Sequence, residues 1–241
     1  MVGKREQNCT KRFAMETPKF QQSFSFMALL KSCAKTRDLQ ECIKIHADAV
    51  ESGLFSKDLY IANTLVSLYA KCGDLAKSRE VFDQIRTRNI VSWTALIASY
   101  AQHGHGKEAI KCFDQMQSID GFSPDAFTYA CILKACGTLK ATRKGQEIHG
   151  KIEKGLLMKN LLVGTAVIDM YAKCGELSKA QEVFDEIPVR NVVSWTSLIS
   201  GYNQHGYGKE ALCVYEEMLY EGLLPNVVTF ICILKACAST G

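Results

Sequence analysis

The chain has 241 residues, 47% of them hydrophobic, and a formal net charge of +4 from 29 basic and 25 acidic residues. This composition supports a buried core and excludes collagen-like and disordered chains, while the charge is too small to identify a partner. No run of eighteen apolar residues is available to span a bilayer, so we expect no membrane association.

The first segment, residues 1–22, is basic and lacks the apolar stretch of a secretory signal. We expect a disordered leader here. An organellar transit peptide is the alternative, although the segment contains Glu6 and Glu16 and no serine.

Eleven cysteines occur in a chain that is too large to need disulfide bonds, and no two have the C-x-x-C spacing of metal and redox sites. Several recur at matched places. Cys33, Cys136 and Cys237 follow LKS or LKA, and Cys72 and Cys174 belong to YAKCG. We expect small buried side chains in a reducing compartment, with neither a metal site nor a cofactor.

The remainder of the chain repeats itself. Residues 59–89 align without gaps to residues 161–191 with fifteen identities in thirty-one positions. The segments that follow, from 90 and from 192, share VSWT, QHG and GKEA, and a third unit recurs at 23, 126 and 227. The long period of 102 residues therefore contains three units of about 31 to 36 residues, which is typical of a solenoid.

Each short unit combines two helical patterns separated by a glycine-containing turn. Pro124 and Pro225 lie just before the next unit begins, where an X-Pro step discourages continuation of a helix. We therefore expect an all-α fold with six helical hairpins over residues 23–226, followed by a single first helix over residues 227–241.

These units resemble the pentatricopeptide repeats of plant proteins, and more narrowly the subclass that alternates standard, long and short repeats. The resemblance rests on the lengths of the units, on their order and on the sequence motifs YAKCG, VSWT and LKAC. It covers residues 23–241. It implies an α-solenoid, a right-handed superhelix of helix-turn-helix repeats. The implied repeats are long at 23–58 and 126–160, short at 59–89 and 161–191, standard at 90–125 and 192–226, and incomplete long at 227–241.

The resemblance further implies binding of single-stranded RNA, with about one base per repeat read by two or three side chains. In the family these readers are the fifth and last residues of a repeat. Here they are Asn63 with Asn89, Thr94 with Asp125, Thr165 with Asn191, and Thr196 with Asn226. The long repeats offer weaker readers, which are Met27 with Asp58, Ala130 with Asn160, and Ile231 alone.

The chemistry of the readers predicts a base order. The carboxylate of Asp125 only accepts hydrogen bonds and suits guanine or uracil, whereas a carboxamide suits adenine or cytosine. In the family, threonine at the fifth position adds a preference for a purine and asparagine a preference for a pyrimidine. The implied order, from 5′ to 3′, is pyrimidine with cytosine favoured, guanine, unspecified, adenine, adenine.

Two further sets of residues are implied to face RNA. The second residue of a repeat packs against the bases in the family, and here it is Tyr60, Val91, Leu162 or Val193. Lys71 and Lys173, at the ends of first helices, could face phosphates or could be solvated lysines at a helix end. Trp93 and Trp195 lie on the opposite helical face, and we expect them in the core.

We predict a non-enzymatic RNA-binding protein of a mitochondrion or chloroplast. A zinc deaminase needs H-x-E and P-C-x-x-C, and neither occurs. Any part in cytidine-to-uridine RNA editing would thus be recognition, with an editing deaminase or another protein acting in trans. One alternative is a protein-interaction solenoid, which a mixed-charge groove would favour. Another is a truncated, non-functional fragment of a longer editing factor, because the chain ends inside a hairpin.

Overall fold

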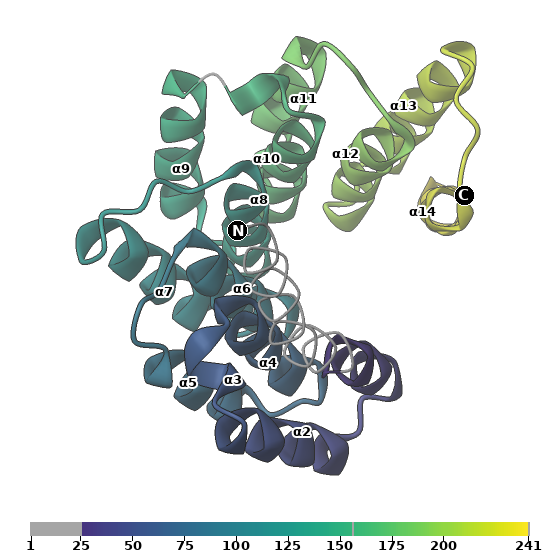
Figure 1. Ribbon diagram of the computed structural model, residues 1–241. Coiled ribbons are helices and arrows are strands. Elements are labelled where there is room, and N and C mark those ends of the chain that lie inside the picture. Colours follow the sequence, from purple (N-terminus) through teal and green to yellow (C-terminus); the bar gives the residue numbers. More distant parts are fainter. Residues whose placement is uncertain (1–25, 156, 241) are drawn as a thin grey trace, which may run out of the picture. The chain divides into compact units, whose positions relative to one another are not determined.

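The computed structural model describes residues 26–155 and 157–240, and within these ranges every regular element is a helix (Figure 1). Residues 26–36 are helical. The elements that follow are α2 (Leu39–Glu51), α3 (Leu54–Lys57), α4 (Leu59–Lys71), α5 (Leu75–Gln84), α6 (Ile90–Gln102), α7 (Gly106–Ser118), α8 (Ala126–Leu139), α9 (Thr142–Lys154), the 3-10 helix η1 (Leu157–Lys159), α10 (Leu161–Cys174), α11 (Leu177–Glu186), α12 (Val192–Gln204), α13 (Gly208–Tyr220) and α14 (Val227–Thr240). The all-α fold expected from the sequence is confirmed.

First helices begin at the residues where the sequence pattern starts a unit, since α4, α6, α8, α10, α12 and α14 start at 59, 90, 126, 161, 192 and 227. Tight turns lead from first to second helices, and glycines such as Gly73 and Gly206 supply the left-handed backbone that these turns need, with φ of 88° and 82°. The sequence did not predict α3 and η1, which are single turns in the connections that precede α4 and α10. The proposed leader at 1–22 lies outside the described residues.

The described part of the chain divides into two compact units, with the boundary between Ser99 and Tyr100. In the first unit, α4 packs against α2, α3 and α5. Its buried stripe includes Ile61, Leu65 and Tyr69. Trp93 meets Phe82 of α5 edge to face, with ring centroids 4.8 Å apart, so Trp93 belongs to the core as expected.

In the second unit, the first helices α8, α10, α12 and α14 form one layer, because α10 packs against α8 and α12, and α12 packs against α14. The second helices α9, α11 and α13 pack against this layer. Trp195 meets Phe184 with ring centroids 4.6 Å apart, which reproduces the pair of the first unit and places Trp195 in the core. None of the described helices is long and apolar enough to cross a bilayer.

Candidate nucleic-acid interface

In the helical repeats from residue 59 onward, the second residue is an apolar or aromatic residue that is about half exposed to solvent. Between 49% and 57% of each residue is exposed at this position, which is occupied by Tyr60, Val91, Phe127, Leu162, Val193 and Val228. Four of these were predicted to sandwich bases, and Phe127 and Val228 are the equivalent residues of the long units. Exposed apolar side chains repeated at one position of the first helices point to a contact surface within each compact unit.

The fifth residue of each of these repeats lies about one turn further along the same helix and is less exposed than the second residue. Asn63, Thr94 and Thr196 are 7–8% exposed, and Thr165 is half-buried. Within the described part of the chain, the buried atoms Asn63 Oδ1 and Thr165 Oγ1 have no hydrogen-bond partner. A buried polar atom without a partner costs about 1 to 3 kcal/mol, so each of these two atoms has an unused hydrogen-bonding capacity.

The last residues of the units are helix N-caps, a role that sequence reasoning missed. Asn191 Oδ1 accepts the backbone N–H of Ser194 at 2.9 Å, and Ser194 Oγ in turn accepts the N–H of Asn191 at 3.0 Å, which forms a capping box. Asp125 Oδ1 accepts from the N–H of Thr128 at 2.8 Å and from its hydroxyl at 2.6 Å. Asn89 and Asn226 cap α6 and α14 in the same manner. Asp58 and Asn160 cap α4 and α10 by accepting the N–H of the second helical residue.

Capping decides which atoms of these side chains remain for a ligand. In Asn191, Oδ1 points at the helix, and the Nδ2 group is left as a donor. In Asp125, Oδ2 is left as an acceptor. The signal for capping was present in the sequence, because a serine or threonine stands three residues after each of Asn89, Asp125, Asn191 and Asn226.

A groove of about 390 Å³ runs over the first helices of the second unit. Its walls include the half-exposed residues Phe127, Leu162 and Val193 together with Ala130 and Thr165. The lining follows the second, fifth, sixth and ninth positions of α8 and α10, which share one face of a helix because they are three or four residues apart. Predicted sandwiching and reading positions are therefore neighbours on one surface.

The charged lining of this groove is mixed, since it contains one lysine, Lys134, and one aspartate, Asp169. The carboxylate of Asp169 lies 2.6 Å from the ammonium group of Lys173, so one of the two proposed phosphate contacts is engaged in an ion pair. Its counterpart Lys71 is exposed at the end of α4.

The weaker readers of the long units differ from the others. Met27 is half-buried in the helical segment 26–36, and Ala130 lines the groove without a polar atom in its side chain. Their partners Asp58 and Asn160 cap α4 and α10. Ile231 is 47% exposed on α14.

Two histidines outside the groove each contact a tyrosine in the first helix of the next hairpin. His46 Nδ1 lies 3.0 Å from the Tyr69 hydroxyl, and His149 Nδ1 lies 3.1 Å from the Tyr171 hydroxyl. Burial lowers the pKa of both imidazoles. Each histidine is the structural counterpart of the other, so repetition explains them without a catalytic role.

Known repeat families account for most of the chain. A model described as the PPR repeat family matches residues 88–138 and 190–239, and one described as the PPR repeat matches residues 24–54, 60–90 and 165–192. The chain belongs to the pentatricopeptide repeat family. The order of standard, long and short repeats stays a prediction.

Relatives in Arabidopsis thaliana cover nearly all of this chain. The chloroplastic pentatricopeptide repeat-containing protein CRR2 is 39% identical over 231 residues, which is 95% of this chain and 35% of that protein. The chloroplastic protein At1g11290 is 39% identical over 217 residues, or 90% of this chain and 27% of its own, and the mitochondrial At3g11460 is 33% identical over 219 residues. The chain thus spans about a quarter to a third of the length of these relatives. Their names agree with the organellar location predicted from the sequence.

The solved structure of maize PPR10 shares the fold. It matches 90% of this chain and 31% of its own chain, with a TM-score of 0.64 and 23% sequence identity. The hairpins described above are therefore pentatricopeptide repeats in fold as well as in sequence.

Proposed function

We propose that this chain binds single-stranded RNA along its first helices and selects bases through the fifth and last residues of its repeats. The observation that supports the proposal best is the recurring pair of a half-exposed apolar side chain and a polar side chain one turn away. At Asn63 and Thr165 the polar atom is buried and unpartnered. A base stacked on the apolar residue would bring its polar edge to that atom.

The capping geometry supports the base assignment. The Nδ2 donor of a capping asparagine suits the ring nitrogen acceptor on the Watson–Crick edge of adenine or cytosine, and the remaining oxygen of Asp125 suits the ring N–H of guanine. The proposed order remains pyrimidine with cytosine favoured, guanine, unspecified, adenine, adenine. In an organelle, such a chain would act in RNA processing or as the recognition part of RNA editing, with a deaminase supplied in trans.

The test is selection of bound sequences from a random single-stranded RNA pool by the purified protein at near-physiological salt. Enrichment of the proposed order supports both RNA binding and the assignment of the repeats. A well-folded protein that enriches no sequence and does not retain the pool would overturn the proposal.

A second candidate function is docking of an extended peptide in the groove over α8, α10 and α12. It is favoured by the mixed charge of Lys134 and Asp169 in a largely apolar lining. Competition separates the two candidates. A matched oligonucleotide displaces a bound peptide only if RNA occupies the same groove. The comparison uses a fluorophore on the peptide, whose anisotropy falls when the peptide is displaced from the groove.

A further inference from the structure

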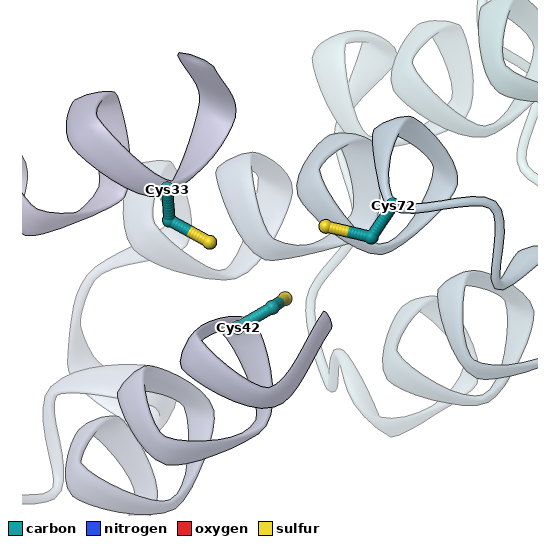
Figure 2. Close-up of side chains that lie close together, drawn as sticks. All are labelled: Cys33, Cys42 and Cys72. Atoms are coloured by element: carbon teal, nitrogen blue, oxygen red, sulfur yellow. The ribbon is translucent and has the colours of Figure 1, made fainter. Parts of the chain in front are cut away.

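Three thiols from separate parts of the sequence meet inside the first unit. Cys33 lies in the helical segment 26–36, Cys42 lies in α2, and Cys72 follows the last residue of α4. Their sulfur atoms all lie within 4.8 Å of one another (Figure 2). Figure 2 shows the three side chains pointing from three helices toward one central point.

The position of each thiol is fixed by the hairpins that hold it. Cys33 and Cys42 are fully buried, and Cys72 is half-buried at the solvent side. The turn between their helices is ordered by Asp38, whose carboxylate caps α2 and whose carbonyl accepts the S–H of Cys33 at 3.4 Å. Cys72 is held by its backbone N–H, which donates to Leu68 O at 3.0 Å.

Two carboxylates lie close enough to the sulfurs to interact with them electrostatically. Glu41 is in the first turn of α2, and Asp38 caps the same helix. Their negative charges favour a positive charge bound at the three sulfurs.

The second set of repeats provides an internal comparison. The positions that correspond to Cys33, Cys42 and Cys72 are occupied by Cys136, Gly145 and Cys174. The space beside Gly145 is filled by the thioether of Met170, and Cys174 Sγ lies 3.9 Å from that sulfur. Across the described residues, the first unit has the one group of three or more histidine, cysteine or acidic side chains close enough to share an ion.

We propose that Cys33, Cys42 and Cys72 form a three-thiolate site for a soft thiophilic cation, Cu⁺ or Zn²⁺. A metal–sulfur distance of about 2.3 Å places three coplanar sulfurs about 4 Å apart, which requires only a small contraction of the present group. Three thiolates complete a trigonal shell for Cu⁺. Zn²⁺ prefers four ligands and would take a water molecule from the side of Cys72, which reaches solvent. Each thiol that binds releases its proton to solvent.

The experiment compares metal binding by the reduced full chain and by two matched variants. Cys42→Ala removes one proposed ligand, and Cys136→Ala removes an equally buried thiol from the second unit. Zn²⁺ and, under anaerobic conditions, Cu⁺ are titrated in separate arms against a chromophoric chelator. Co²⁺ serves as a spectroscopic probe for sulfur-to-metal charge transfer, and native mass spectrometry gives the number of ions bound.

We expect one tight ion in the unaltered chain and in Cys136→Ala, and at least tenfold weaker binding in Cys42→Ala. The metal that binds with the higher affinity in the two separate titrations is the one that the site prefers. Equal affinity in all three proteins, or no ion beyond weak binding to exposed thiols, would overturn the proposal. If Cys42→Ala loses its helical circular dichroism, Cys72→Ala replaces it, because this half-buried position tolerates truncation better.

Discussion

The hydroxyl of Thr196 lies 2.8 Å from the hydroxyl of Thr229, which connects the fifth residue of one repeat to the third residue of the next. The Thr229 hydroxyl also lies 3.0 Å from Oδ1 of Asn226, and both threonines are buried. The two residues proposed to read one base, Thr196 and Asn226, are thus joined through a third residue. On the proposed function, base specificity at this position depends on a hydrogen-bonded group rather than on two independent side chains.

Thr229→Val tests this connection. The substitution keeps the shape of the side chain but removes the bridging hydroxyl, so the backbone N–H of Asn226 loses its acceptor at 3.3 Å. We expect a loss of about 1 to 3 kcal/mol in the free energy of unfolding and a weaker preference for adenine at the Thr196 position. Urea unfolding and binding to RNAs that differ at this base measure the two effects. Thr138→Val, at an exposed threonine of α8, is the control, and equal effects in both variants would contradict the connection.

Asp125→Asn separates capping from base reading. Asparagine caps a helix as well as aspartate does, so the free energy of unfolding should change by less than about 0.5 kcal/mol. The atom left for the ligand changes from an acceptor to a donor, and the preferred base should shift from guanine toward adenine. Asp125→Ala should instead lose about 1 kcal/mol of stability together with the preference. Binding to RNAs with each of the four bases checks the shift, and an unchanged preference would rule out Asp125 as a reader.

Leu162→Ala tests stacking in the groove. This residue is half-exposed, so the substitution should cost little stability. It should weaken binding of matched and mismatched RNA by a similar amount, on the order of 1 kcal/mol, because stacking does not distinguish bases. Leu219→Ala on α13 is the matched control, since its exposure of 45% is close to the 49% of Leu162. A greater effect from Leu219 than from Leu162 would place the RNA elsewhere.

The lowered pKa values of two histidines predict a free energy of unfolding that decreases at acidic pH. Burial lowers the pKa of His46 and His149 in the folded protein, whereas the unfolded chain binds protons at each residue with the ordinary pKa of about 6.5. The unfolded state therefore binds more protons as the pH falls below about 7, and the free energy of unfolding decreases. Thermal unfolding between pH 8 and pH 5 should show this decrease. A double variant, His46→Gln with His149→Gln, should show a shallower dependence, and an unchanged slope would exclude these two residues.

The repeat pattern was sufficient to predict the all-α fold, because Pro124 and the recurring apolar stripes limit where helices can run. It was not sufficient for features that depend on contacts between units. Lys71 and Lys173 have the same place in the sequence pattern, yet Lys173 pairs with Asp169, and the residue that corresponds to Asp169 in α4 is Ser67.

The three cysteines show the same limit, because the repeat pattern does not predict contacts between helices that are distant in the sequence. The cysteines lack the close spacing of a metal motif in the sequence, and Cys42 and Cys72, which are 30 positions apart, meet because α2 packs against α4. The capping residues were predictable from the serine or threonine three positions later. The pattern of base readers concerns side chains alone, so it does not indicate that the same residues cap the backbone that follows them.

The N-caps also restrict how the recognition of a repeat can change. On the proposed function, the side chain that selects a base is the one that starts the next first helix, as Asn191 does for α12. A substitution there is compatible with folding only if the new residue can still accept the N–H groups of a first turn, which limits the choice to asparagine, aspartate, serine, threonine and, at a small cost, glycine. The set of residues through which such a protein can acquire a new RNA target is therefore limited by helix initiation as much as by the chemistry of the bases.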